Sequence, residues 1–483
     1  MNRKAVLRAL GIVLVCEAGF MLPSLFVAFH YREGESAAFL TTLFLLLSVG
    51  LPLTRIRVRI RELYARDGFA IVAFGWLSMA FFGALPFVFS GTIPGLVDAL
   101  FESMSGFTTT GASILPVVEG LPRSILFWRS FTHWIGGMGV LMLTLAILPL
   151  FGAGSLHILR AESPGPSTGK LVPKIGQTAK ILYGLYVGLT LAEIIALKIA
   201  GMSWFDALIH AFGTAGTGGF SNRNASVGAY GSLAINLIIG VFMFLFGMNF
   251  TLHYQITRRN WRFVLKDEEL RFYVAMVAGA TLFIAADLWV NSLFSPGPAL
   301  EHAFFQVSSI TTTTGFATAD FHGWPVFSKV TLLVLMIVGP CAGSTGGGMK
   351  SIRVLMALKI IRRELVKMKH PQSVHTVRIG GRNVDDETLG GVTAFILFYL
   401  VLMVLAIFLV AMDSHDLETA FSSVVACLSN IGPGLSVVGP MGNYSGFHPL
   451  SKVVLSLCMV IGRLEIFPIL LLAMPSFWRR VSI

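Results

Sequence analysis

Four stretches of this sequence decide its fold: DALFESMSGFTTTGAS (98–113), DALIHAFGTAGTGGFS (206–221), EHAFFQVSSITTTTGFAT (301–318) and ETAFSSVVACLSNIGPGL (418–435). Each begins with an acid, continues with the pattern of a short amphipathic helix and ends in a glycine-centred turn. When Gly111, Gly219, Gly315 and Gly432 are aligned, the acid lies 13 or 14 residues upstream in every copy. The glycines are 108, 96 and 117 residues apart, so the chain contains a fourfold internal repeat.

The composition around these stretches is that of a membrane protein with many spans. Of 483 residues, 55% are apolar and only 13% are charged, and the mean hydropathy is +0.76. A soluble globular chain carries about a quarter charged residues. The net charge of +11 does not indicate nucleic-acid binding, secretion or disorder, because the basic residues lie in short loops between apolar runs.

About 20 apolar residues cross one bilayer, and by this measure the chain has ten full spans. They begin near Leu7, Ala37, Gly68, Ser124, Ile181, Gly231, Phe272, Phe327, Leu389 and Lys452. The four repeated stretches lie between them and are too short to cross, which favours re-entrant hairpins. We therefore expect an all-α polytopic membrane protein with ten transmembrane helices and four re-entrant pore-helix loops in fourfold pseudo-symmetry.

The basic residues predict the orientation. Most Lys and Arg lie at the two ends and in 52–67, 151–180, 257–271 and 350–388, which the positive-inside rule places in the cytoplasm. Both termini are then cytoplasmic, and the four short segments enter from the outer side. Two full spans separate successive copies, so the repeats are parallel around an axis normal to the membrane.

Acids stand at the entrance to each short segment. A ring of acids concentrates cations at an outer mouth, and the candidates are Asp98, Glu102, Asp206, Glu301 and Glu418. Ordinary helix capping explains any one of them equally well, because Asp and Glu favour helix N-termini. Both interpretations stay open at this point.

The glycine turns have the chemistry of a cation pathway. A dehydrated monovalent cation needs fixed neutral oxygens, which backbone carbonyls and Thr hydroxyls supply. Carbonyls point at an axis only where the backbone leaves the regular helix, and glycine tolerates the dihedral angles required. A single Thr-Thr-Gly segment is more often a packed loop. Four aligned copies on one side of the membrane favour a pore.

Several motifs together resemble the Trk/Ktr/HKT superfamily of potassium-uptake proteins, most closely its bacterial TrkH family, over essentially the whole chain. They are FTTTGAS, GGFSN, TTTGFAT and SNIGPGL at the glycines, HWIGGMG (133–139), RAESPGP (160–166), GPCAGSTGGGMKSIR (339–353) and IGRLEIFP (461–468). The resemblance implies two extra N-terminal helices (1–67) and four pore repeats (68–150, 151–256, 257–388 and 389–483).

The resemblance also implies the site and its partners. Potassium is the transported substrate, no organic cofactor is needed, and the filter is formed by Thr109, Thr110, Gly111, Gly218, Gly219, Thr314, Gly315, Ile431 and Gly432. The family forms homodimers and binds cytoplasmic regulatory subunits of the TrkA type, which bind nucleotide or NAD. The implied location is the bacterial inner membrane, with lipid and no nucleic acid as a partner. Gly216 and Thr217 in the second repeat depart from the family pattern.

The span that begins at Phe327 is interrupted at 339–348 by Pro and several glycines, which disfavour a helix. We expect an unwound loop there that acts as a gate, the role that the resemblance implies, with Gly343, Ser344, Thr345, Gly346, Gly347, Gly348, Lys350 and Arg463 as the gate residues. Arg463 lies mid-span, where a charge normally faces a cavity or an acid, so it is either a barrier to cations or a structural ion pair. GSTGGGMKS resembles a Walker A loop, but Met349 breaks the spacing and no strand precedes it.

Three functions compete at this stage. The first is a passive, gated potassium conduit under cytoplasmic control. The second is a proton- or sodium-coupled symporter, which needs a titratable residue on the pathway, and only Arg463, Lys350 and Glu193 lie deep. The third is a membrane enzyme, which the absence of paired carboxylates or an HExxH motif disfavours. Segments 163–166 and 350–382 are candidate docking surfaces, although lipid headgroups explain the basic stretch equally well.

Overall fold

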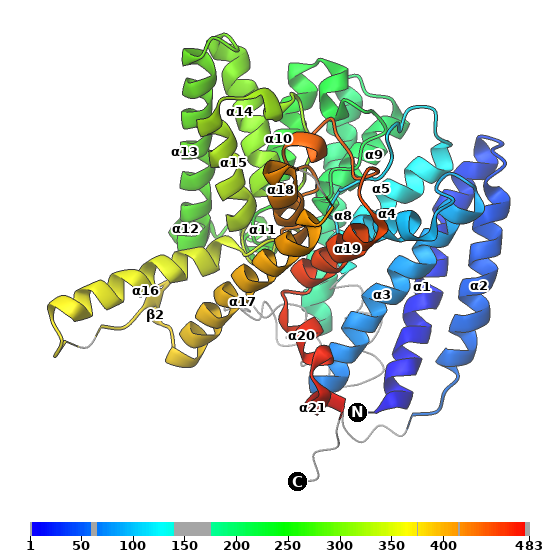
Figure 1. Ribbon diagram of the computed structural model, residues 1–483, viewed down its shortest axis with the longest axis horizontal. Helices are drawn as coiled ribbons and strands as arrows, with labels where there is room; N and C mark the ends of the chain where they lie inside the picture. Colours follow the sequence, from blue (N-terminus) through cyan, green and yellow to red (C-terminus); the bar gives the residue numbers. More distant parts are fainter. Residues whose placement is uncertain (1, 59–64, 140–174, 374, 414–415, 479–483) are drawn as a thin grey trace.

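The computed structural model describes residues 2–58, 65–139, 175–373, 375–413 and 416–478 (Figure 1). This part of the chain is mostly helical. The one sheet in it is a two-residue antiparallel hairpin of β1 (Arg378–Ile379) and β2 (Arg382–Asn383).

Among the described residues, six helices are long and apolar enough to cross a membrane. They are α1 (Arg3–His30), α2 (Ser36–Thr54), α3 (Ala65–Phe89), α8 (Ile175–Ile199), α13 (Glu268–Val290) and α17 (Asp386–Ala411). A seventh span in the described residues is the pair α10 (Leu233–Phe246) and α11 (Phe250–Thr257), if the 100° bend between them is counted within one crossing.

Each repeated stretch contains a short helix followed by a second helix of 13 to 15 residues. The short helices are α4 (Leu96–Phe107), α9 (Trp204–Gly216), α14 (Pro296–Thr311) and α18 (Leu417–Leu428). The second helices are α5 (Arg123–Gly137), α10, α15 (Val326–Val338) and α19 (Pro449–Arg463).

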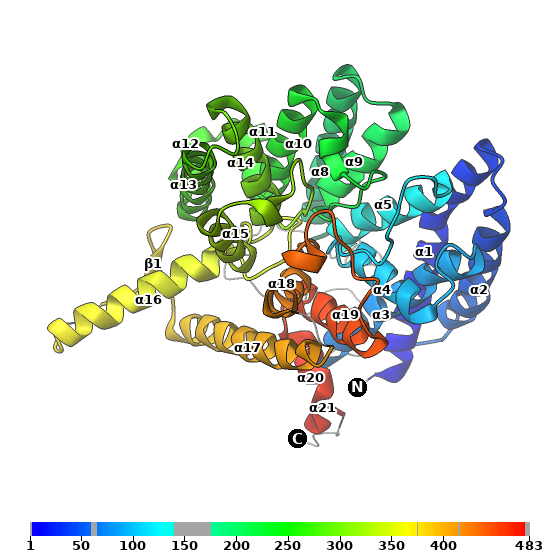
Figure 2. The same ribbon diagram turned by 45° about the horizontal axis from the view of Figure 1, so that its top comes forward.

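The remaining elements connect these helices or follow them. They are α12 (Trp261–Lys266), α16 (Ser351–Lys369), α20 (Phe467–Ala473), α21 (Pro475–Trp478) and the 3₁₀ turns η2 (Ser226–Tyr230), η3 (Phe321–Gly323) and η4 (Ser436–Val438). Figure 2 shows α16 extending away from the other helices.

Ten continuous spans are therefore not confirmed, because the second helices stop early. Backbone contacts between segments explain one break: the Gly247 carbonyl after α10 accepts from the Cys341 amide, and the Phe250 amide donates to the Gly343 carbonyl. α15 ends at Val338, and its C-cap residue Gly339 directly precedes Pro340. After α19, Glu465 and Ile466 adopt positive φ, which a helix excludes.

The repeats pack in a closed cycle. Each short helix contacts the first helix of its own repeat, in the pairs α3 with α4, α8 with α9, α13 with α14 and α17 with α18. It also contacts the second helix of the preceding repeat, in the pairs α5 with α9, α10 with α14, α15 with α18 and α19 with α4. The last pair joins the fourth repeat to the first, so the ring of repeats closes.

The first two helices lie outside this cycle. α1 packs along α2 and against α3 and α5, on the side of the first repeat (Figure 1). The predicted boundary between the first and second repeats falls within residues 140–174, outside the described residues, as does the RAESPGP motif at 160–166. The four segment boundaries as a set stay predictions.

Closure of the cycle yields a test of stability. Lys452 on α19 forms a 2.6 Å ion pair with Asp98 on α4, and the Lys452 side chain is almost fully buried. We expect Asp98→Asn to lower the unfolding free energy by about 1–2 kcal/mol, because a buried ammonium loses its partner while Asp98 itself is partly hydrated. Thermal unfolding in detergent measures this. Asp386→Asn, in an exposed pair with Arg363, is the control and changes stability by less than about 0.5 kcal/mol. Equal losses of stability in the two variants would contradict a stabilising role for the buried pair of Lys452 and Asp98.

Candidate functional site

Four backbone carbonyls form a closed ring where the four short helices end. A Cβ added at Gly111 would collide with the carbonyl oxygen of Gly218, and one at Gly219 with that of Thr314. A Cβ at Gly315 would meet the oxygen of Ile431, and one at Gly432 that of Thr110. Each glycine thus lies against the residue before the glycine of the next repeat. We call the carbonyls of Thr110, Gly218, Thr314 and Ile431 the carbonyl ring.

The backbone leaves the helix in the same way in all four copies. The aligned glycines have φ of +81° (Gly111), +75° (Gly219), +87° (Gly315) and +95° (Gly432). Two residues earlier, φ is also positive, at 56° (Thr109), 55° (Thr217), 60° (Thr313) and 57° (Asn430). Two left-handed residues stop the helix and turn the carbonyls away from its axis. The short helices also direct their partly negative C-terminal ends toward the ring.

Side chains hold the turns in place. The Thr108 and Thr110 hydroxyls lie 2.8 Å apart, as do those of Thr312 and Thr314. Asn430 donates to the Thr110 hydroxyl at 3.0 Å and so joins the fourth repeat to the first. The Tyr444 hydroxyl donates to the Gly432 carbonyl at 2.8 Å.

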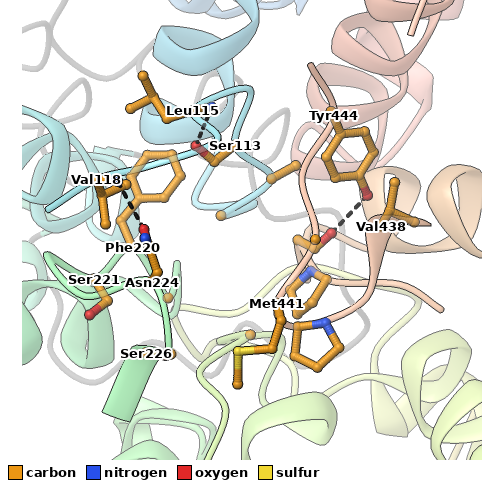
Figure 3. Close-up of a pocket in the computed structure, with 18 of the residues that line it drawn as sticks. Ser113, Leu115, Val118, Phe220, Ser221, Asn224, Ser226, Val438, Met441 and Tyr444 are labelled. Carbon is orange, nitrogen blue, oxygen red and sulfur yellow. Dashed lines mark hydrogen bonds between the residues drawn. The ribbon is translucent and has the colours of Figure 1, made fainter. Parts of the chain in front are cut away.

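A cavity lies on one side of the ring (Figure 3). The four aligned glycines line it together with residues that follow them in the chain, including Ser113, Phe220 and Pro433. Its charged lining residues, within the described part, are Arg129 and Arg223. None of the five predicted mouth acids is among them.

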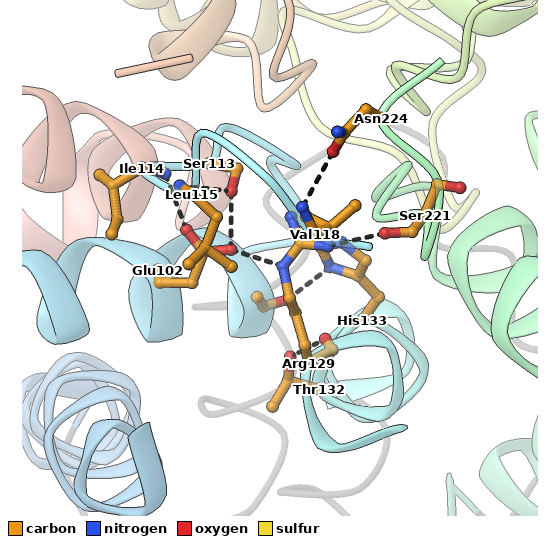
Figure 4. Close-up of polar contacts among 11 residues, drawn as sticks. Glu102, Ser113, Ile114, Leu115, Val118, Arg129, Thr132, His133, Ser221 and Asn224 are labelled. Atoms are coloured by element: carbon orange, nitrogen blue, oxygen red, sulfur yellow. Dashed lines mark hydrogen bonds and ion pairs between the residues drawn. The ribbon is translucent and has the colours of Figure 1, made fainter. Parts of the chain in front are cut away.

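Each mouth acid contacts a polar group on a neighbouring segment. Glu301 accepts from Asn236 at 2.7 Å, Glu418 pairs with Lys329 at 3.2 Å, and Asp206 accepts from Asn222 at 2.6 Å. Asp98 pairs with Lys452 as described above, and Glu102 with Arg129 at 2.5 Å (Figure 4). Asp98, Asp206 and Glu418 also lie in the first turns of their helices, which fits capping. A role in concentrating cations stays a prediction.

The loop between α15 and α16, residues 339–350, lies on the other side of the ring. Where it meets the four turns, it contacts residues that precede the aligned glycines: the Gly347 amide donates to the Thr313 hydroxyl at 2.8 Å. A Cβ on Gly346 would meet the Thr312 carbonyl, and one on Gly347 would meet Asn430, both at less than 3.0 Å. These two positions therefore require glycine, because a Cβ at either one would collide with a neighbouring turn. The predicted unwound loop is present, and its gating role stays a prediction.

Two basic side chains predicted for the gate are held at this loop. Arg463 donates to the Thr345 carbonyl at 2.7 Å, the Thr109 hydroxyl at 3.1 Å and the Gly136 carbonyl at 2.6 Å. It therefore connects the loop, the turn of the first repeat and the end of α5. Lys350 donates to the Gly346 carbonyl within the loop. Glu465, which helix geometry makes a poor partner for Arg463, pairs with Arg353 of α16.

Some residues of the site are not among those predicted from the sequence. Arg129 lies five residues into the predicted span from Ser124, and a charge within a span signals a functional or paired residue. That signal was sufficient to single it out. Tyr444 and Asn430 gave no comparable signal, since their roles depend on contacts between distant repeats. In the described residues, no cluster of three or more His, Cys, Asp or Glu could hold a metal ion. The oxygens of the ring are backbone carbonyls, which are neutral.

The whole chain is similar to known transport proteins. The profile of the TrkH family, described as a cation transport protein, matches residues 35–480. The chain is 40% identical to the Trk system potassium uptake protein TrkH of Salmonella typhimurium, over 99% of this chain and 100% of that protein. The chain belongs to the TrkH family. It is also 34% identical to the Trk system potassium uptake protein TrkG of Escherichia coli, over 95% of both chains.

The fold agrees with a solved member of the family. The crystal structure of the potassium transporter TrkH from Vibrio parahaemolyticus superimposes with a TM-score of 0.89 at 38% identity, covering 99% of this chain and 100% of that one. This TrkH-family chain is therefore a membrane protein with several apolar spans, and its relatives are named as transporters rather than enzymes.

The ring geometry predicts the effect of a side chain at Gly315. Gly315→Ser places a Cβ against the Ile431 carbonyl at a left-handed φ, which costs about 1–3 kcal/mol of strain. We expect the ratio of rubidium to sodium uptake into proteoliposomes to fall by about tenfold or more. Gly279→Ser is the control, because nothing lies within 4 Å of a Cβ there. An unchanged uptake ratio in folded Gly315→Ser protein would show that Gly315 is not part of a selectivity filter.

Proposed function

We propose that this protein takes up potassium through a gated, channel-like pathway whose selectivity filter is the carbonyl ring. The observation that supports this most strongly is the cyclic order in which each aligned glycine faces the carbonyl before the next one. Four converging neutral oxygens replace part of the hydration shell of a monovalent cation without binding it too tightly to release. The names of the relatives favour potassium as the ion.

The proposed architecture has ten membrane crossings. In it the short helices α4, α9, α14 and α18 are re-entrant, and the broken second helices complete their crossings with the segments that follow. Irregular backbone at membrane depth is tolerated where it lines a watery cavity, and the cavity beside the ring supplies one. Both termini then face the cytoplasm of a bacterium, and the membrane is the inner one.

The proposed gate is loop 339–350 together with Arg463. Its support is the loop's position against Thr313 and the contact of Arg463 with both the loop and Thr109. A guanidinium here raises the barrier to a cation leaving the ring, and displacement of the loop would lower it. Control would come from a cytoplasmic nucleotide- or NAD-binding subunit of the TrkA type, acting on a homodimer.

Coupled symport is the second candidate, and one observation favours it. Glu193 on α8 is fully buried, and within the described residues both of its carboxylate oxygens lack a hydrogen-bond partner. α8 packs against the short helix α9, so a buried titratable group does lie on a helix that contacts one of the four short helices. A proton-coupled mechanism requires such a group. Glu193→Gln would then abolish uptake driven by a proton gradient. A passive pathway predicts that this variant retains potassium-driven flux.

Rubidium-86 uptake tests the proposal directly. Proteoliposomes containing only this protein, loaded with potassium and lacking proton or sodium gradients, should accumulate rubidium, and external potassium should block the uptake. Uptake that appears only with a proton or sodium gradient would overturn the passive mechanism in favour of symport. No uptake under either condition, even after addition of a TrkA-type subunit with nucleotide, would contradict the transport assignment.

The gate has its own test. Deleting Gly346 to Gly348 removes the part of the loop closest to the ring, and we expect rubidium flux without a regulatory subunit to rise severalfold. The deletion protein must elute as a folded species at the wild-type position in size-exclusion chromatography. Wild-type flux and regulation in that protein would mean that the loop is only a packing element.

A further inference from the structure

A buried ion pair beside the carbonyl ring distinguishes the first two repeats from the others. Arg129 Nε lies 2.5 Å from Glu102 Oε1, and the side chains are 4% and 0% exposed (Figure 4). In the alignment of the four glycines, the corresponding residues of the other three short helices are His210, Gln306 and Ser423, none of them acidic. Uncharged side chains hold the outgoing chain in these repeats: His210 contacts Ser221, Gln306 contacts Phe316, and Ser422, which precedes Ser423, accepts from the Leu435 amide. A charge is therefore not needed simply to hold such a turn.

Glu102 fixes the chain that leaves the ring in the first repeat. Its Oε2 accepts from the Ile114 amide at 2.9 Å, and its Oε1 accepts from the Ser113 hydroxyl at 3.0 Å. Ser113 and Ile114 are the second and third residues after Gly111. Both carboxylate oxygens are thus engaged, and the hydrogen bonds to them are strengthened by the charge.

Arg129 fixes the same part of the second repeat. Its Nη1 donates to the Ser221 carbonyl at 3.0 Å, and its guanidinium lies 3.6 Å from the centre of the Phe220 ring. Phe220 and Ser221 directly follow Gly219. The planar guanidinium makes the ion pair, the carbonyl contact and the ring contact together, which a lysine ammonium cannot reproduce.

We propose that Glu102 and Arg129 form a positioning pair that sets the spacing between the turns of the first and second repeats, and that potassium over sodium discrimination depends on it. This inference rests on the proposed function of the ring. Gly111 and Gly218 are neighbours in the ring, so a shift between the two turns changes the separation of the Thr110 and Gly218 carbonyls. A ring whose oxygens can move inward coordinates the smaller sodium ion better. A connected polar network behind the turns resists this inward movement and so favours potassium.

The energetics of burial support a role in specificity. Burial removes the hydration of both charges, and the attraction between them compensates for this cost only when their geometry is good. Proteins in which such a pair is replaced by neutral side chains are often equally stable. Three of the four repeats have neutral groups at this place. The pair is therefore best explained by the fixed spacing that it imposes between the turns of the first and second repeats. Together the two charges are neutral, which keeps the positive guanidinium in the cavity wall from repelling cations strongly.

The test uses the double variant Glu102→Gln/Arg129→Gln, which leaves no unpaired buried charge. We expect it to fold and to transport rubidium, while the rubidium to sodium uptake ratio falls by about tenfold, since hydrogen bonds to charged groups are lost. Arg129→Lys keeps the ion pair but not the contacts of the guanidinium plane, and we expect an intermediate ratio. The matched control is Glu268→Gln/Lys359→Gln, which removes an ion pair between α13 and α16 away from the ring. We expect this control to leave the rubidium to sodium uptake ratio unchanged.

The outcomes separate this inference from the proposed function. A wild-type ratio in folded double variant, or in folded Arg129→Lys if the double variant does not fold, overturns the positioning role. A fall in total uptake with an unchanged ratio also overturns it, because a purely structural pair changes the amount of active protein and not the ion ranking. Absence of rubidium uptake by the wild-type protein would instead overturn the proposed function itself.

Discussion

The structure depends on one steric constraint: where the four turns meet, there is no room for a Cβ. Each aligned glycine lies against a carbonyl oxygen of the next turn, at a φ that other residues adopt only with strain. The oxygens can converge only because these positions lack side chains. The short helices, their packing against the preceding repeat and the polar contacts behind the turns all serve to hold this crowded backbone in place.

The loop on the far side of the ring obeys the same constraint. A Cβ on Gly346 or Gly347 would lie less than 3.0 Å from atoms of the third or fourth repeat, too close for a side chain. Arg463 then joins the loop to the first repeat through Thr109 and Thr345. Ring and loop are thus one connected polar assembly, and the loop cannot be displaced without breaking contacts that reach several repeats.

Much of this was predictable from the sequence, because the information was local or periodic. The repeat spacing located α4, α9, α14 and α18, and the aligned glycines marked the ring. The lengths of the second helices were not predictable from hydropathy. Their ends depend on contacts such as that of Gly247 with Cys341, which join segments far apart in the chain. The partners of Glu102 and Arg129 were hidden for the same reason, since one residue of each contact lies in another turn or helix.

The ring is built by one chain, so its four quarters are encoded by different codons. In a channel of four identical subunits, every substitution enters the pore four times. Here Asn430 can differ from Thr109, Thr217 and Thr313, and Glu102 from His210, without forcing the same change elsewhere. In the proposed filter, evolution can therefore adjust ion preference in single steps of small effect. A protein engineer can do the same, by altering one quarter while three intact quarters preserve the opening.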